Sequence, residues 1–146
     1  MDRPGCRKMP THTVFDHTAD LGLRVRAESF EGLCEEAACG LTEVIAGNPG
    51  MIRPILGETI TVPGVEPVWL LFDLLSELLV AFELRRMLFA ECRVSRTSDG
   101  IRADCRGERF DPARHRLAHE VKAITQHELE VRQTSAGWEA TLILDI

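Results

Sequence analysis

Two short polar motifs near opposite ends of this 146-residue chain contain the residue types best suited to chemistry. The first is the His-Thr-Ala-Asp sequence of residues 17–20, and the second is the pair Asp145 and Ile146, which ends an apolar stretch over residues 140–146. An ionised carboxylate in such a stretch is costly to bury unless a cation or hydrogen-bond donors compensate it. We therefore expect Asp145 to have a partner.

The α-carboxylate of Ile146 follows Asp145 directly, so the covalent chain alone holds two negative groups close together. If the fold adds the carboxylate of Asp20, the three groups form an oxygen-ligand site that suits Ca²⁺ or Mg²⁺ rather than Zn²⁺. Asp16 is a less favoured ligand. In the competing interpretation, Asp20 caps a turn and Asp145 accepts backbone N–H bonds, and spacing alone favours these structural roles.

Other catalytic motifs are missing from the sequence. It has no glycine-rich phosphate loop, no Gly-x-Gly-x-x-Gly, no Gly-x-Ser-x-Gly and no His-Glu-x-x-His, which argues against self-contained enzymes of these common classes. His115 and His119 have the spacing of two ligands on one helical face, but they lie beside Pro112 in a stretch typical of a loop. We do not expect this pair to bind a metal by itself.

Composition restricts the partners and the compartment. The net charge of −6 opposes tight binding to a phosphate backbone by charge alone, so a protein or metal partner is favoured. The five cysteines form no Cys-x-x-Cys pair, which argues against a disulfide framework or a zinc ribbon and favours a reducing compartment, the cytoplasm. The longest apolar stretch, residues 68–82, contains polar residues and is too short to cross a membrane.

The chain has the size and hydrophobic content of one compact domain. Hydrophobic residues make up 45% of the sequence, which is enough for one continuous core. The first dozen residues carry basic side chains with no apolar run behind them. We therefore predict a flexible leader over residues 1–12 and a single domain over residues 13–146.

Two amphipathic patterns predict helices. Ser29 suits the N-cap of a helix over residues 30–45, in which apolar residues recur every three or four positions. Its two cysteines, Cys34 and Cys39, are expected to pack in the core as small hydrophobic residues. Pro67 suits the first turn of the second helix.

This second helix, over residues 67–85, is apolar nearly all round and has only a narrow polar stripe. Such a helix is typical of the middle of a molecule. We therefore expect it to be covered on more than one side. Its aromatic side chains Trp69, Phe72 and Phe82 are expected to lie in the core.

The remaining patterns predict strands, because apolar positions alternate or cluster between turn residues. They cover residues 21–27, 58–62, 89–96, 101–107, 120–125, 129–132 and 138–146, with a hairpin turn at Asp99 and Gly100. Helices come early and strands come late along the chain. This order favours an α+β domain in which two helices pack on a largely antiparallel or mixed β-sheet.

Several blocks, in the family's order from about residue 13 to the end, resemble the archease family. They are residues 15–22, residues 110–112 with His115, residues 120–125, His127, Leu129, Val131, residues 137–138 and the final pair Asp145 and Ile146. Each block is weak singly, but the set is specific. One departure is Gln126, where the family often has an aromatic residue, commonly Tyr, so no role for that side chain is carried over.

This resemblance implies a function and a fold. Archeases assist the RtcB-type tRNA-splicing RNA ligase, promoting formation of its guanylylated intermediate and allowing multiple turnover. By resemblance, the chain is an accessory factor rather than an enzyme, is related in fold to SHS2 domains, meets tRNA only indirectly, and is a monomer when free.

The resemblance also implies site residues. It maps the family's acidic metal site onto Asp20, Asp145 and the C-terminal carboxylate of Ile146. Lys122 and His17 are candidates for stimulating the ligase. We expect the cofactor to be a divalent cation, calcium first, with magnesium or manganese as alternatives.

Two other functions compete with this one. The first is a stand-alone metal-dependent phosphohydrolase, against which the sequence offers no evident nucleophile or general base. The second is an RNA-binding chaperone, against which the negative charge and the aromatic content of 5% both count.

Overall fold

A computed structural model describes residues 10–17 and 20–146 of the chain. Most of the predicted leader, residues 1–9, lies outside the described residues, as do Thr18 and Ala19 of the first motif. The first strand begins at Thr11, two residues before the domain start that the sequence predicts.

The described chain forms two α-helices, seven β-strands and one short 3₁₀ helix. In chain order they are β1 (Thr11–His17), β2 (Asp20–Ala27), α1 (Phe30–Ile45), the 3₁₀ helix (Pro49–Met51), β3 (Leu56–Pro63), α2 (Pro67–Arg85), β4 (Met87–Arg96), β5 (Gly100–Arg109), β6 (Ala123–Thr134) and β7 (Gly137–Asp145).

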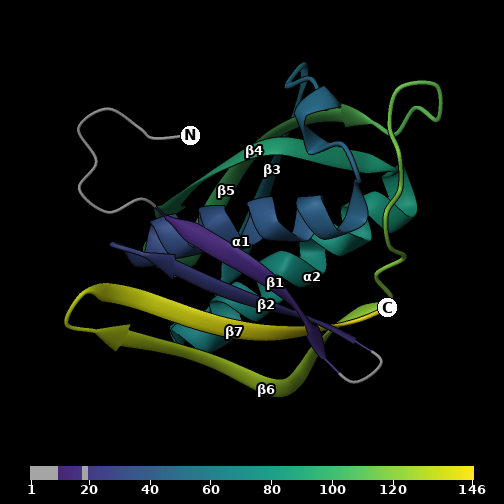
Figure 1. The fold of residues 1–146 in the computed structure, drawn as a ribbon. Coiled ribbons are helices and arrows are strands. Elements are labelled where there is room, and N and C mark those ends of the chain that lie inside the picture. The colour runs from purple at the N-terminus through teal and green to yellow at the C-terminus, as the bar shows by residue number, and fades with distance from the viewer. Residues whose placement is uncertain (1–9, 18–19) are drawn as a thin grey trace.

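The strands form two antiparallel sheets with the two helices between them (Figure 1). One sheet has four strands in the order β1-β2-β7-β6, and the other has three in the order β3-β5-β4. The predicted α+β class is confirmed, and the structure adds that the strands are divided between two sheets. Helix α1 contacts β2 on one side and β4 on the other, so each sheet covers one face of the helical layer.

Helix α1 begins and ends where its sequence predicts. The Ser29 hydroxyl accepts a hydrogen bond from the Gly32 N–H at 3.0 Å, which is the expected N-cap. Cys34 is fully buried, as predicted, but the prediction for Cys39 is wrong because its side chain is exposed. At 3.6 residues per turn, five positions rotate a side chain by about 140° around the helix, which takes it off the buried face.

Helix α2 is covered by α1 and by both sheets, but one strip of its surface remains open to solvent. Phe82 is buried and Phe72 is half-buried. The prediction for Trp69 is wrong, because 45% of its surface is exposed, and Leu84 is exposed too. A layer of only two helices leaves the outer side of α2 without a neighbour.

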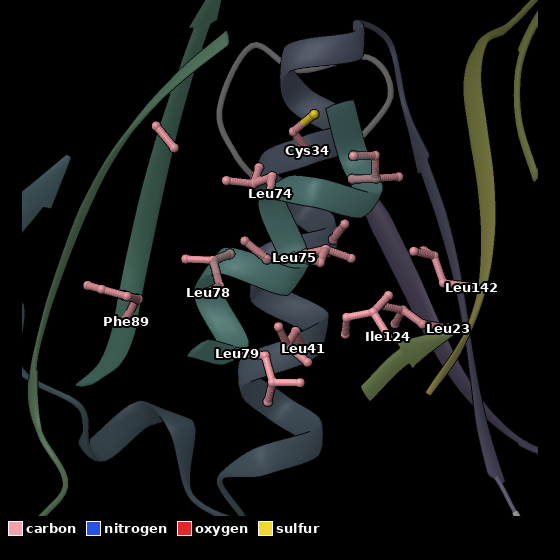
Figure 2. Packing of buried hydrophobic residues seen from close by; sticks show 14 of the residues in the cluster. Leu23, Cys34, Leu41, Leu74, Leu75, Leu78, Leu79, Phe89, Ile124 and Leu142 are labelled. Carbon is pink, nitrogen blue, oxygen red and sulfur yellow. The ribbon is translucent and has the colours of Figure 1, made fainter. Parts of the chain in front are cut away.

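The core fills the space between the two sheets. Figure 2 shows its centre, where leucines of α2 meet Leu41 of α1, Phe89 of β4, and Leu23 and Leu142 of the four-stranded sheet. Truncating one such buried leucine to alanine typically costs about 2–5 kcal/mol. None of the helices among the described residues is long and apolar enough to cross a membrane.

One late strand differs from its prediction. The sequence predicts separate strands over residues 120–125 and 129–132, whereas the structure has one strand, β6, whose pairing with β7 is irregular between Thr125 and Glu130. Glu128 has a φ of 53° within this irregularity. Residues 120–122 lie outside the strand and end the loop that precedes it. The chain therefore reaches the sheet three residues later than predicted.

Candidate functional site

The strand pairing brings the two end motifs together. Strands β2 and β7 are antiparallel neighbours, and Asp20 lies directly opposite Asp145. On the other side of β2, His17 occupies the β1 position opposite Asp20. As directly paired residues of β2 and β7, Asp20 and Asp145 have side chains on the same face of the sheet. Two carboxylates separated by 124 intervening residues of sequence are thus side by side at one end of the four-stranded sheet.

The next pair inward, Leu21 and Leu144, is buried and faces the helices. Because successive side chains alternate between the two faces of a strand, Asp20 and Asp145 project from the opposite face. Both are half-buried at the sheet's end. The apolar C-terminal strand therefore does not force the Asp145 carboxylate into the core.

Asp20 borders a shallow hollow of about 700 Å³, here called the sheet-end hollow. It is lined by Asp16, Asp20, Leu21, Ala118, His119, Glu120, Lys122 and Ile146. In Figure 1 the C-terminus lies beside the loop that descends from the three-stranded sheet. Three of the predicted site residues, Asp20, Lys122 and Ile146, thus share one cavity, and the structure adds Glu120 and the less favoured Asp16.

Asp145 does not line this hollow, but it holds one wall in place. Its backbone carbonyl accepts a hydrogen bond from the Lys122 N–H at 2.7 Å. The Lys122 side chain itself is exposed. The sequence did not single out Glu120, because the pattern around it predicts a strand over residues 120–125. Only the loop geometry places Glu120 at the hollow.

The loop before β6 is anchored on the C-terminal end of α1. The Ala118 N–H donates to the Ile45 carbonyl at 2.8 Å, and the Gly47 N–H donates to the Arg116 carbonyl at 2.8 Å. The first of these bonds uses the Ile45 carbonyl, which the end of α1 leaves without a partner within the helix. The wall formed by residues 118–122 is therefore fixed to α1 at its start and to β7 at its end.

Glu108 is a buried carboxylate, with only 4% of the residue exposed, and it supports the base of the same loop. It accepts hydrogen bonds from the Arg53 backbone N–H at 2.7 Å, from the Arg114 guanidinium at 2.8 Å and from His115 Nε2 at 3.0 Å. Burial alone would raise the pKa of the Glu108 carboxyl, but these hydrogen bonds outweigh burial and hold that pKa well below its usual range.

His115 is a full member of this network. Its Nδ1 accepts a hydrogen bond from the Asp111 N–H at 2.9 Å, which assigns the ring proton to Nε2, the donor to Glu108. The His115 side chain is fully buried, whereas His119 is exposed at the sheet-end hollow. The structure therefore separates the two histidines that helical spacing would have placed together.

Phe15 and Gly22 of the first motif have a structural role. They are paired across β1 and β2, and a Cβ atom at Gly22 would overlap the Phe15 ring. The Arg24 guanidinium lies 4.7 Å from the centre of that ring, in cation–π geometry. Any larger residue at position 22 would force the Phe15 ring to move from its place over the backbone of β2.

The donors around the hollow fit a hard cation better than zinc, because the carboxylates of Asp16, Asp20 and Glu120 outnumber the single imidazole of His119. Among residues 10–17 and 20–146, no three His, Cys, Asp or Glu side chains are close enough to hold a metal ion by themselves. A cation bound by Asp20 and Asp145 would therefore draw its remaining ligands from the Ile146 carboxylate, water or a partner. The ligand roles of Asp20, Asp145 and Ile146 stay predictions.

The chain is similar to known proteins over nearly its whole length. The profile of the Archease protein family matches residues 12–146. A protein archease from Pyrococcus abyssi is 34% identical over 137 residues, covering 90% of this chain and 96% of that protein. The Methanosarcina mazei protein archease is 35% identical over 145 residues, covering 92% of this chain and 95% of that protein. The solution structure of Methanobacterium thermoautotrophicum protein 1598 has a TM-score of 0.76 at 26% identity. The match covers 92% of this chain and 98% of that protein.

Proposed function

Because the chain belongs to the archease family, we propose that it is an accessory protein of an RtcB-type tRNA-splicing RNA ligase, which promotes guanylylation of the ligase and multiple turnover. The observation that carries this proposal is the sheet-end hollow. It places Asp20, the Ile146 carboxylate and an exposed lysine at one end of a rigid sheet. Such a charged, open surface suits docking near the active site of another protein.

Asp20, Asp145 and the Ile146 carboxylate would hold a divalent cation, which we expect to be calcium, with magnesium or manganese as alternatives. When bound, the cation would neutralise phosphate charge during nucleotidyl transfer. Asp145 aligns the site through its pairing with Asp20 and its bond to the Lys122 backbone. The exposed Lys122 ammonium adds a mobile positive charge that can reach a nucleotide phosphate.

The charge balance favours a protein as the direct partner. Acidic residues outnumber basic ones in the chain and also around the hollow, so a bare RNA backbone is repelled. We therefore propose that the protein works as a monomer when free, meets the ligase in the cytoplasm and approaches tRNA only through it. His17, opposite Asp20 in the β1–β2 pairing, remains a candidate for contact with the ligase.

The test is a multiple-turnover ligation assay with a cognate RtcB-type ligase. Asp20→Asn and Lys122→Ala should each reduce the stimulation of ligase turnover by about tenfold or more, while Lys122→Arg keeps part of it. The matched control is Asp73→Asn, an exposed aspartate on α2 outside the hollow, which should stimulate like the wild type. Folded variants that all stimulate equally would contradict the assignment of the site.

A second test addresses the Ile146 carboxylate. Appending Gly-Ser after Ile146 moves the terminal charge away from the hollow without changing a side chain. If the carboxylate is a ligand, the extended protein should lose Ca²⁺ affinity in a calorimetric titration. A protein with an amidated C-terminus should lose Ca²⁺ affinity as well. Unchanged Ca²⁺ binding in both would remove Ile146 from the ligand set.

The two competing functions have their own signatures. Phosphate release from a generic phosphomonoester by the isolated protein, with a metal and no ligase, would favour a phosphohydrolase. Tight binding to tRNA at physiological salt in the absence of ligase would favour an RNA chaperone. We expect neither, because the described residues that line the hollow include no serine, threonine or cysteine nucleophile and no Phe, Tyr or Trp ring on which a base could stack.

A further inference from the structure

Two of the five cysteines meet in the three-stranded sheet, on the opposite side of the helical layer from the sheet-end hollow. Cys92 of β4 and Cys105 of β5 are directly paired in the antiparallel register. The Cys92 thiol donates a hydrogen bond to the Cys105 sulfur at 2.9 Å. Residues paired in this way have Cα atoms about 4.5–5.5 Å apart, within the range that a disulfide spans.

The two thiols differ in access. Cys105 is 1% exposed, whereas Cys92 is half-buried and lines a hollow of about 400 Å³ between α1 and β4. The exposed Cys39 of α1 lines the same hollow, together with Glu35 and Arg93. A small reagent can therefore approach the pair from the Cys92 side.

We propose that Cys92 and Cys105 are a site of reversible oxidation to a cross-strand disulfide by a low-molecular-weight disulfide of the glutathione type. The Cys92 sulfur forms a bond to one sulfur of glutathione disulfide, and one glutathione leaves as its thiol. The Cys105 sulfur then bonds to Cys92 and releases the second glutathione. The two cysteines lose two protons and two electrons, and one glutathione disulfide is reduced to two thiols.

The geometry makes the second step favourable, because the resolving sulfur is already in contact with the first. The hydrogen bond to Cys105 and burial raise the pKa of the Cys92 thiol well above its usual range. Little thiolate is therefore present at neutral pH, and the first step is slow. The pair should therefore react slowly with alkylating reagents, whereas the contact between the two sulfurs favours closure of the disulfide once a mixed disulfide has formed.

The disulfide should act on stability rather than on the sheet-end hollow. It would join neighbouring strands of one hairpin, β4 and β5, and so restrict the unfolded chain without moving the folded one. We expect the oxidised protein to melt at a higher temperature than the reduced protein. This inference is independent of the proposed function, because neither cysteine lines the sheet-end hollow.

The experiment equilibrates the full chain in glutathione buffers of increasing oxidation, then denatures it and alkylates every remaining thiol. A Cys6→Ser background removes the cysteine that lies outside the described residues. Tryptic digestion without reductant should release residues 87–93 linked to residues 103–106. The oxidised chain should lose two alkylatable thiols, and reducing buffer should restore both.

Cys39→Ser is the matched control and should still form the same linked peptide. Cys92→Ala and Cys105→Ala should each abolish it. Full alkylation of both cysteines in the most oxidising buffer would overturn the proposal. So would a disulfide that joins Cys92 to Cys39 instead. Because the digest of the Cys6→Ser chain alone decides between these outcomes, a further variant that fails to fold leaves the test intact.

Discussion

Carboxylates occur in two contrasting settings within one loop region of this molecule. Glu108 is buried, yet Arg53, Arg114 and His115 surround it with donors, and its pKa is lowered. At the other end of the loop, Glu120 is exposed. It lies with Asp16 of β1, which is also exposed, and with other acidic groups around the sheet-end hollow. The first setting compensates its charge inside the chain, and the second concentrates charge of one sign at the surface.

Structural and functional carboxylates can be separated by these two settings. A buried charge that is fully hydrogen-bonded stabilises one arrangement of loops, because removing a partner leaves an uncompensated group in a region of low dielectric. A cluster of like charges at an open surface contributes little to folding, and it is available for a cation or a partner. Stability and activity should therefore respond to opposite sets of mutations.

The largest effect should come from Glu108→Ala. It leaves the buried His115 donor and the Arg114 guanidinium without their acceptor, so we expect the free energy of unfolding to fall by about 3 kcal/mol, a value reduced by the solvent exposure of Arg53. Urea denaturation followed by circular dichroism measures it. The control is Glu91→Ala, an exposed carboxylate on β4, with a change within about 0.5 kcal/mol.

Acid titration provides a second measure of the same group. Because the pKa of Glu108 is lowered in the folded state, its contribution is fully present above the ordinary value of 4.5 and is lost as the pH falls below it. The stability difference between wild type and Glu108→Gln should therefore shrink steadily below pH 4.5. A difference that stays constant down to the acid transition would show that the charge of Glu108 is unimportant.

A smaller effect, and on binding rather than folding, is expected for Glu120→Gln. Removing one negative charge from the sheet-end hollow should weaken Ca²⁺ binding by roughly tenfold while the free energy of unfolding changes by no more than about 0.5 kcal/mol. Calorimetric titration and urea denaturation measure the two quantities. If this variant were destabilised as strongly as Glu108→Ala, the contrast between the two settings would fail.

His12 offers an intermediate case with the smallest expected effect. It joins the edge strand β1 to α1 through hydrogen bonds with Glu36 at 2.6 Å and Glu43 at 2.5 Å. The bond to Glu36 is the main cause that raises the pKa of His12 to about 9, against the opposing effect of burial. The stabilisation is therefore complete below pH 6.5 and is lost as the pH rises through 9.

We expect the free energy of unfolding to fall by about 1 kcal/mol between pH 6.5 and 9, since the site is partly open to solvent. Chemical denaturation across this pH range measures the decrease. His12→Gln should flatten the profile, and His127→Gln, an exposed histidine in β6, should not. A wild-type profile without any decline over this range would argue against a charged His12.

Much of the fold is predictable from local patterns. The helix limits at residues 30–45 and 67–85 agree with the structure, because Ser29 and Pro67 are local start signals and the apolar periodicity is helical. The predictions that failed concern surroundings. Cys39 and Trp69 have the composition of core residues, but their exposure depends on which neighbours the helices acquire.

The candidate site was predictable only in part. Asp20 and Asp145 stood out because of their motifs and the apolar strand around Asp145, and the register brings them together. Glu120 did not stand out, because its position depends on the three residues by which β6 begins late. The Cys92 and Cys105 contact also depends on strand register, which spacing along the chain does not reveal.

Local sequence patterns were enough to predict most of the elements, the α+β class and the polar end motifs, because each of these depends on residues a few positions apart. Tertiary contacts were needed to show that the strands form two sheets, that Glu108 accepts hydrogen bonds from Arg53, Arg114 and His115, and that Glu120 reaches the sheet-end hollow. These outcomes depend on pairing between distant segments, and a pairing shift of one residue would turn every side chain to the other face.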